Sequence, residues 1–494
     1  MSDPYLSIIV FLPVIGAIVI ALLPKADPRR IKLTAAVFTL VTFALSLAVF
    51  AMFDRSAEGA QFVMKASWIP SINANYFLGI DGLSLPMLIL TTLLGFIAVL
   101  VSWRINLRPR EYFAALLLLE TGILGVFCSL DLLLFFLFWE VEIIPMYLLI
   151  SIWGTGRKEY SAIKFVIFTL IGSAMMLAGI LLLYFHAGTF DMTELARLGL
   201  EPVLGGLLAA AIFLLLFIGY AVKLPLFPFH TWLPDAHTDA PTAVSVILAG
   251  VLIKMGGYGM IRVCVSIFPE TAERYAPPLL ALALVSILYG AAVTLRQRDM
   301  KRLIAYSSIS HMGFVMLGVF AFSQVSMTGA TLQMFSHGII TGLLFALVGL
   351  VYDKSHVRDV PRLGGLARQM PIIVVVFSVA GLASLGLPGT SGFAAEFLIF
   401  LGSFGSNVVN GIHVYTIFGV LGVVLTAGYI LWMLQRVFYG PPKPEYEGVA
   451  DANKLESFYI FVLVAVIMLI GIYPAILTNV IKMGVSPIVA PFGL

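Results

Sequence analysis

Acidic and basic side chains stand inside stretches of this sequence that are otherwise hydrocarbon. They are Glu140 and Glu142 in "FLFWEVEIIPMYLLI", Lys254 in "LAGVLIKMGGYGMIR", and Lys223 and Glu396 in comparably apolar runs. One charge at the centre of a membrane helix costs about 2.5–3.5 kcal/mol. Four of them, Glu140, Lys223, Lys254 and Glu396, would together cost about 10–14 kcal/mol on that scale if unpaired, which rivals the net stability of a whole domain. We therefore expect these residues to be paired or hydrated, and two acids and two bases can balance one another.

Composition places these charges in a membrane protein. The chain has 494 residues, of which 61% are hydrophobic and only 11% are charged. A soluble domain has about 25% charged residues. Apolar runs of roughly 18 or more residues recur along the whole chain, and each is long enough to cross a bilayer as a helix. A β-barrel is disfavoured, because its strands would alternate polar and apolar residues. The net charge of +3 is too small to suggest nucleic-acid binding.

The apolar runs predict an all-α polytopic membrane protein with about fourteen spans. We expect these spans near 5–24, 31–52, 81–103, 112–129, 131–152, 161–186, 207–227, 242–267, 277–295, 302–322, 326–352, 371–402, 412–438 and 457–481. Basic residues gather after odd-numbered spans, as in Arg104, Arg108 and Arg110, whereas the loop at 187–206 is acidic. The positive-inside rule then predicts that odd loops are cytoplasmic and that both termini lie outside.

Two spans are expected to be broken. The seventh continues as "YAVKLPLFPFHTWLPDAHTDAPTAVSV", and the twelfth contains "GLASLGLPGTSGFAAEFLIF". Non-helical backbone at membrane depth is tolerated only where it is buried in protein or lines a hydrated cavity. Broken helices in corresponding halves of a chain indicate a transport site. The two breaks are five spans apart. Two helices separated by an odd number of spans cross the membrane in opposite directions. The sequence therefore predicts two inverted five-helix repeats, with Lys223 and Glu396 at matching positions.

These repeats divide the chain into four parts. We expect an N-terminal three-helix segment at 1–110, a first repeat of spans 4–8 at 111–270, a second repeat of spans 9–13 at 271–440, and a loop with the last span at 441–494.

The buried charges suit an ion relay. Lysine holds its proton less tightly in an apolar environment and more tightly beside a carboxylate. Glu140 and Glu142 are two residues apart, about 200° around a helix, so they cannot face the same partner. Pro145 cannot donate to the carbonyl of Val141, which predicts a kink beside both acids. We expect Glu140 to be the relay acid and Glu142 a lateral contact. The alternative is that the charges form buried ion pairs that only hold the bundle together.

Other ionisable residues have two interpretations. His311 and His337 lie inside spans, where a histidine is either a packed core residue or a group that passes a proton between its ring nitrogens. Glu120 is a further buried acid without an obvious partner. A polar segment carries four residues that resemble metal ligands but fit a solvated helix-capping loop better: His230, Asp235, His237 and Asp239. Cys128 and Cys264 lack any metal-ligand spacing and are expected to be core thiols.

Three segments carry a resemblance to a known family. "FWEVEIIPMYLLI", "VKLPLFPFHTWLPDAHTDAPTAVSVILAGVLIKMGGYGMIR" and "KRLIAYSSISHMGFV" are similar to the antiporter-like membrane subunits of respiratory complex I, the proton-translocating NADH:quinone oxidoreductase. The resemblance covers residues 80–440. Among these subunits the chain looks most like the M-type, or chain 4, because Glu396 stands where relatives carry a lysine.

The resemblance implies a proton relay and a role for each residue in it. Glu140 would be the carboxylate of span 5, Lys223 its lysine partner, Lys254 the central lysine, His337 a linking histidine and Glu396 the terminal group. Separation of the acid from Lys223 would send a proton to Lys254, and from there out through Glu396.

The resemblance also implies partners. This chain would hold no cofactor, whereas NADH, FMN, iron–sulfur clusters and quinone would bind to partner subunits. Its neighbours would be the L-type and N-type antiporter-like subunits and the lipid bilayer, in a bacterial cytoplasmic membrane or alternatively a mitochondrial inner membrane. Three other functions stay open: an Mrp-type Na+/H+ antiporter subunit, a purely structural membrane scaffold, and a membrane subunit of a related hydrogenase or ferredoxin-linked complex.

Overall fold

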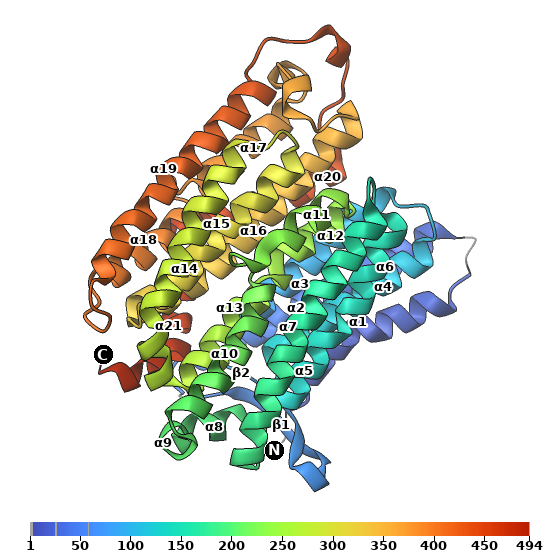
Figure 1. Cartoon of the computed structure of the whole chain (residues 1–494). Coiled ribbons are helices and arrows are strands. Elements are labelled where there is room, and N and C mark those ends of the chain that lie inside the picture. The colour runs from blue at the N-terminus through green and yellow to red at the C-terminus, as the bar shows by residue number, and fades with distance from the viewer. Residues whose placement is uncertain (1–2, 25–26, 58, 494) are drawn as a thin grey trace.

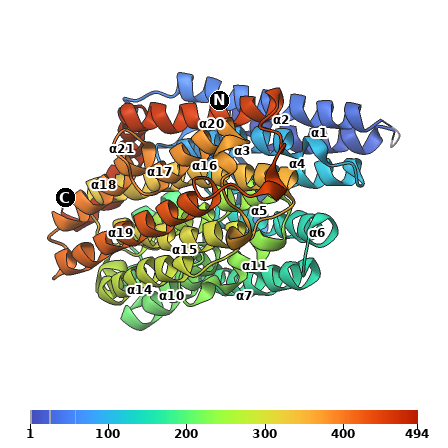
Figure 2. The same cartoon turned by 90° about the horizontal axis from the view of Figure 1, so that it is seen from above.

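Long helices packed side by side dominate the computed structural model, which describes residues 3–24, 27–57 and 59–493 (Figure 1). A two-stranded sheet and the short helices α8 and α9 lie at one end of the bundle, and both ends of the described chain lie there too. Seen from above, α7, α10 and α14 follow one edge and α1, α2 and α20 the opposite edge (Figure 2). Residues 1, 2, 25, 26, 58 and 494, which fall within the predicted segments 1–110 and 441–494, lie outside the described residues.

The first part of the chain contains seven helices and the two strands. They are α1 (Tyr5–Leu22), α2 (Pro28–Met52), β1 (Gln61–Ile69), β2 (Ala74–Ile80), α3 (Ser84–Val101), α4 (Pro109–Cys128), α5 (Leu132–Val141), α6 (Ile143–Trp153) and α7 (Lys158–Ala187). The middle part contains shorter pieces: α8 (Met192–Leu198), α9 (Glu201–Leu204), α10 (Gly206–Lys223), α11 (Trp232–Asp239), α12 (Thr242–Ile247), the π-helical η4 (Leu248–Leu252), α13 (Lys254–Gly259) and the π-helical η5 (Met260–Val265).

The last part returns to long helices. They are α14 (Pro269–Leu295), α15 (Met300–Val319), α16 (Gln324–Ser355), α17 (Pro371–Ser384), α18 (Ser391–Phe404), α19 (Ile412–Val437), α20 (Lys454–Ile472) and α21 (Ala475–Val489). Short 3₁₀ turns occur at 70–72, 102–104, 229–231, 360–362, 366–368, 444–446 and 490–492.

Thirteen helices of the described chain, counted with the turns that continue them, are long and apolar enough to cross a membrane. The helical membrane architecture predicted from the sequence is therefore confirmed. The count differs from fourteen for identifiable reasons. Helix α15 contains many polar residues, the twelfth predicted span consists of the shorter α17 and α18, and the last is divided into α20 and α21 at Pro474.

Helix starts follow local chemistry that the sequence already contains. Asp131, Asp191 and Asp299 cap α5, α8 and α15, and each side chain accepts hydrogen bonds from backbone N–H groups of the first turn. Ser323 and Asn453 form capping boxes at α16 and α20. These side chains satisfy donors that a helix start leaves without a partner, which fixes where each helix begins.

One feature of the N-terminal part differs from the all-α prediction. Strands β1 and β2 form an antiparallel hairpin between α2 and α3, with Lys65 opposite Phe77 and Ala66 opposite Tyr76. The hairpin closes at Pro70–Ile72, and Asn73 adopts a positive φ of 53°. Asparagine tolerates this left-handed conformation better than most residues, which favours a turn here.

The predicted interruptions are present in both halves of the chain. Helix α10 ends at Lys223 and α11 begins at Trp232, while α17 ends at Ser384 and α18 begins at Ser391. The fifth span is also interrupted, because Glu142 lies in a turn between α5 and α6. Pro145 in the first turn of α6 lacks an N–H for the carbonyl of Val141, which accounts for this turn.

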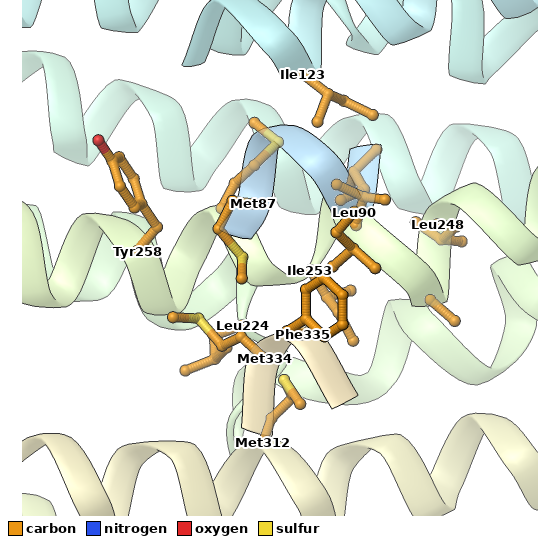
Figure 3. Close-up of a cluster of buried hydrophobic side chains, with 14 of the residues drawn as sticks. Met87, Leu90, Ile123, Leu224, Leu248, Ile253, Tyr258, Met312, Met334 and Phe335 are labelled. Carbon is orange, nitrogen blue, oxygen red and sulfur yellow. The ribbon is translucent and has the colours of Figure 1, made fainter. Parts of the chain in front are cut away.

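Apolar side chains from several helices fill the centre of the bundle. Met87 and Leu90 of α3 and Ile123 of α4 pack with Leu248, Ile253, Met312, Met334 and Phe335 (Figure 3). Each of these side chains is at least 97% buried. This cluster surrounds the helical stretch that carries Lys254, so any proton path must go around or through a close-packed apolar layer.

Close packing between α16 and α18 gives a first prediction. A Cβ atom on Gly329 would lie 2.6 Å from the backbone nitrogen of Ile399 and 2.9 Å from the carbonyl carbon of Leu398. Gly329→Ala therefore must push α18 away, at a cost of about 1–3 kcal/mol. Thermal unfolding of the chain in detergent should show a lower midpoint. The control is Gly428→Ala on exposed α19, where the nearest atom lies 3.8 Å away, and it should unfold at or above the parent temperature. Equal midpoints for both variants would contradict this packing.

Candidate functional site

An ion pair between Glu142 and Lys223 lies inside the first half of the bundle. Lys223 donates to the Oε1 atom of Glu142, and both side chains are at least 98% buried. The Lys223 ammonium also lies 5.3 Å from the ring centre of Trp139 and 5.7 Å from that of Phe165, where aromatic faces favour a cation. The pair is thus almost completely buried, and two aromatic rings lie beside its ammonium.

Helix ends position both members of this pair. Lys223 is the last residue of α10, and Glu142 lies in the turn that separates α5 from α6. Helix α4 approaches this turn closely, because a Cβ on Gly122 would lie 3.3 Å from the backbone nitrogen of Glu142. Residues at helix ends can move with fewer broken backbone hydrogen bonds than residues inside a helix.

The structure reverses the expected pairing of the two acids of the fifth span. Glu140 was expected to face Lys223, but the ion pair is made by Glu142. Glu140 is partly exposed, and its buried Oε1 atom has no hydrogen-bond partner. Glu142 keeps helical dihedrals (φ −73°, ψ −20°), so the two acids still lie about 200° apart around the helix, and only one of them can face Lys223.

Lys254 forms the start of a second group, in the middle of a helix that changes its winding. The π-helical η4 precedes it and η5 follows soon after. Lys254 is fully buried, its Nζ atom contacts the carbonyl oxygen of Ala249, and it lies 2.8 Å from Nδ1 of His337 on α16. π-helical turns are frequent at functional sites, because they free a backbone carbonyl for a side chain.

The second group continues from His337 to His311 and Glu396. The rings of His337 and His311 are 5.2 Å apart between centres, without a direct hydrogen bond. Nδ1 of His311 lies 3.3 Å from Oε1 of Glu396, and Nε2 of His311 lies 3.3 Å from the hydroxyl of Ser384. The amide of Gln333 donates to Glu396 at 3.4 Å and lies 3.5 Å from Nδ1 of His311.

The break between α17 and α18 makes room for Glu396. Gly386 has a φ of +81°, and a Cβ there would lie 3.0 Å from Oε2 of Glu396. Only glycine adopts this backbone conformation without strain, and it also leaves space at the carboxylate. Lys223 and Glu396 do not occupy matching positions, because Lys223 precedes its break whereas Glu396 follows the other break by several residues.

The polar segment from His230 to Asp239 is not a solvated loop. Most of it forms α11, and His230, Asp235, His237 and Asp239 are each at most 8% exposed. Asp235 pairs with Lys164 at 2.7 Å, and Asp239 accepts from Ser161 at 2.6 Å. Among the described residues, no group of three or more histidine, cysteine or acidic side chains is arranged to hold a metal ion.

Within the described structure, the remaining candidates make no hydrogen bond or ion pair with either group. Glu120 is 1% exposed, its Oε1 atom has no hydrogen-bond partner, and its carboxylate lies against Gly95. His237 is fully buried, stacks on Phe345 at 4.5 Å, and neither of its ring nitrogens has a partner. Cys128 and Cys264 are free and buried, as expected.

The structure therefore brings the predicted residues together in two buried groups. The first contains Glu142 and Lys223, and the second contains Lys254, His337, His311 and Glu396. The sequence did not single out Gln333 and Ser384, which complete the second group. Their only signal was a polar side chain within an apolar span, and many such side chains merely bond to a backbone carbonyl one turn earlier.

The pairing of Lys223 can be tested by double-mutant cycles. Residues in contact show interaction energies of about 0.5–3 kcal/mol. Glu142→Gln and Lys223→Gln, alone and together, should give a coupling in this range by thermal unfolding in detergent. The matched cycle of Glu140→Gln with Lys223→Gln should give a smaller coupling. A larger coupling for Glu140 than for Glu142 would contradict the observed pair.

Comparison with known proteins gives this arrangement a family context. Residues 129–426 match the family model described as NADH:quinone oxidoreductase/Mrp antiporter, transmembrane. This range includes every residue of both buried groups.

Two curated relatives match nearly the whole chain. The NAD(P)H-quinone oxidoreductase chain 4 1 of Synechococcus elongatus is 45% identical over 97% of this chain and 90% of the relative. The NADH-quinone oxidoreductase subunit M of Rhodobacter capsulatus is 42% identical, over 98% of this chain and 96% of the relative. A chain in the structure of respiratory complex I from Thermus thermophilus with bound NADH superimposes with a TM-score of 0.88 at 29% identity, covering 98% of this chain and 99% of that chain. The chain belongs to the NADH:quinone oxidoreductase/Mrp antiporter family of transmembrane subunits.

Proposed function

We propose that this chain is a proton-translocating membrane-arm subunit of an NADH:quinone oxidoreductase, complex I. It is an integral membrane protein, and its relatives are named as subunits of that oxidoreductase. The observation that carries the proposal is the buried line of ionisable groups, in which Lys254, His337, His311 and Glu396 follow one another within membrane helices. A scaffold would not need such groups, because apolar packing stabilises a bundle at least as well as buried ion pairs do.

The first step in this mechanism is the separation of Glu142 from Lys223. A buried ammonium keeps its proton because a carboxylate lies beside it, and it releases the proton when that carboxylate moves away. Both residues lie at helix ends, next to backbone that is already interrupted, which supports such a movement. Quinone reduction in other subunits would supply the energy.

The later steps use the second group. Lys254 lies within hydrogen-bond distance of His337, and an imidazole can accept a proton on one nitrogen and release another from the second. Nε2 of His337 has no partner within the described structure, so it is free to pass a proton on. The gap from His337 to His311 needs a ring rotation or a water molecule. From His311 the proton reaches Glu396, which faces the break between α17 and α18.

Two features support the proposal that 111–270 and 271–440 are inverted repeats. Asp131 forms an isolated β-bridge with Asp191, and Asp299 forms one with Asp359, so each bridge spans 60 residues. Asp131 and Asp299 also cap the helices that follow them, α5 and α15.

The breaks extend this correspondence. Lys223 ends α10 and contacts Glu142, which follows the helix that Asp131 caps. In the same way, Ser384 ends α17 and contacts His311, which lies in the helix that Asp299 caps. His237 and Glu396 are each the sixth residue after their breaks, in α11 and α18. Glu396 of the second repeat therefore corresponds in position to His237 of the first repeat. This correspondence supports a role for His237 in the relay of the first repeat.

A cavity supports an uptake path for protons. It has a volume of about 390 Å³ and is lined by Arg104 and Asp353 at the end that the positive-inside rule predicts to be cytoplasmic. It is also lined by Ala240, Thr242 and Lys301, where α11 passes into α12. Protons from that side would come to the helix that carries His237.

Partners and cofactors follow from the same proposal. NADH, FMN, iron–sulfur clusters and quinone would bind to other subunits of the complex. The lateral neighbours would be antiporter-like subunits of the L and N types. The membrane would be a bacterial cytoplasmic membrane, since a relative from Rhodobacter capsulatus matches nearly the whole chain. No group on this chain is proposed to carry electrons.

An Mrp-type Na+/H+ antiporter subunit is the second candidate function, and the family description includes it. Glu396 favours the oxidoreductase, because the resemblance assigns a glutamate at this position to the M-type subunit. The two whole-length relatives, at 45% and 42% identity, carry oxidoreductase names as well.

Inverted membrane vesicles with the assembled complex test the proposed function. Glu142→Gln should abolish NADH-driven proton uptake and strongly lower NADH oxidation with quinone, because Lys223 loses the group that controls its proton. Glu140→Gln should retain more of both activities. The exposed Glu273→Gln should behave like the parent and controls for expression. Normal NADH-driven uptake in an assembled Glu142→Gln complex would refute the relay, and uptake driven by a Na+ gradient without NADH would favour the antiporter.

A further inference from the structure

A second cavity lies at the opposite end of the bundle, beside the β-hairpin. Its volume is about 500 Å³, and it is lined by β2, α8 and α21, with Leu130, Met192 and Ile488 among the apolar residues. Asp81 and Arg262 are charged residues in its wall. Both ends of the described chain lie here, and this end is predicted to be the non-cytoplasmic side.

Arg262 and Asp81 form a closed ion pair in this wall. Nη2 of Arg262 donates to both carboxylate oxygens of Asp81, at 2.6 and 2.7 Å. The exposures of the two side chains are only 12% and 14%. Asp81 also accepts from the backbone nitrogens of Leu83 and Ser84, at 3.0 and 3.1 Å, so the start of α3 holds the carboxylate in place.

Arg262 lies on the same stretch of helix as Lys254, with Tyr258 between them. Residues four apart share a helix face, so Tyr258 stands between the relay lysine and the arginine. The Tyr258 hydroxyl accepts from Nε of Arg262 at 3.2 Å and donates to the carbonyl of Phe127 at 3.3 Å. It points away from the central apolar cluster (Figure 3). The ring of Tyr258 packs against Phe127 and Phe135, with centres 5.2 and 6.5 Å apart.

This arrangement has a direct consequence for protons. A guanidinium has five N–H donors, no acceptor, and keeps its charge in proteins. On the Arg262 side of the Tyr258 hydroxyl, a proton would meet N–H donors and a positive charge. A fixed arginine excludes protons and cations from pores in the same way.

We propose that Arg262, held by Asp81, is a proton-excluding seal between Lys254 and this outer cavity. It stops protons from running directly from the relay lysine to the non-cytoplasmic side, so that they must pass through His337 and Glu396 instead. This inference rests on the proposed function, because a seal is needed only where a proton relay crosses the membrane.

Passive proton leak tests the seal without any turnover. The purified, assembled complex is reconstituted into liposomes with an entrapped pH dye, a pH gradient is imposed without NADH, and its decay is followed with K+ and valinomycin present. Arg262→Gln offers both a donor and an acceptor in place of the guanidinium. The gradient should then decay on the order of tenfold faster than with the parent, because a fixed unit charge has been removed from the path. Arg262→Lys retains a donor-only cation and should stay tight.

Two further variants make the test decisive. The control is Lys65→Gln, which removes a cation at the same end of the bundle but outside the cavity wall. It also breaks an ion pair, in which Nζ of Lys65 lies 2.6 Å from Asp191. Liposomes with this variant should stay tight. Arg262→Gln leaves Asp81 without its partner, which can prevent assembly of the complex. The double variant Asp81→Asn/Arg262→Gln removes both charges of this pair, and it should leak. An assembled double variant as tight as the parent, or an Arg262→Lys variant that leaks like Arg262→Gln, would overturn the seal.

The outcomes for the seal and for the proposed function are separate. The leak is measured without NADH, so its result does not depend on pumping. Absence of NADH-driven proton uptake by the parent complex would refute the proposed function, whatever the leak in the Arg262 variants. Normal pumping by the parent with tight Arg262→Gln liposomes would refute the seal alone.

Discussion

A charge inside the bilayer has to be matched by a partner, and the pair of Glu142 and Lys223 meets this constraint most directly. Both side chains are buried almost completely, so neither can exchange its partner for water without a movement of the protein. The same condition shapes the second group, where Lys254 contacts a backbone carbonyl and an imidazole instead of an acid. Because each charge depends on one or two nearby groups, a small displacement of a helix end changes where a proton is held. The need for a partner at every buried charge therefore both stabilises the bundle and lets a proton change its position.

Because helices are interrupted here, these displacements break few backbone hydrogen bonds. Glu142 lies in a turn, Lys223 ends a helix, and Glu396 faces the glycine-rich break between α17 and α18. Around them the bundle is rigid, since glycines such as Gly329 bring backbones into direct contact and apolar side chains fill the centre. Interrupted backbone thus occurs at the places that carry these ionisable groups. The two ends of the bundle carry different cavities: Lys301 lines one of them, and the pair of Arg262 and Asp81 lines the other.

Much of this organisation could be predicted from the sequence, because the bilayer imposes strong patterns. Long apolar runs predicted the spans, prolines and glycines predicted the breaks, and isolated charges predicted Lys223, Lys254 and Glu396 as members of buried groups. Side-chain pairings and local backbone features could not be predicted from the sequence. Helical phase predicted that Glu140 and Glu142 face different sides, but it could not say which of them faces Lys223. The β-hairpin, the π-helical turns beside Lys254, and the contacts of Gln333 and Ser384 depend on packing between distant segments. Polar residues of α11 were expected in solvent, yet they bond to Lys164 and Ser161 of a neighbouring helix.

The central claim is that Lys223 changes partners as protons move. Cryo-electron microscopy of the intact complex, at rest and during turnover with NADH and quinone, tests it most directly. At rest, the ammonium of Lys223 should lie on Glu142. During turnover, a second population should appear in which Lys223 is turned away from Glu142 and water reaches it. A single population with Lys223 fixed on Glu142, in a sample that is pumping protons, would contradict the account.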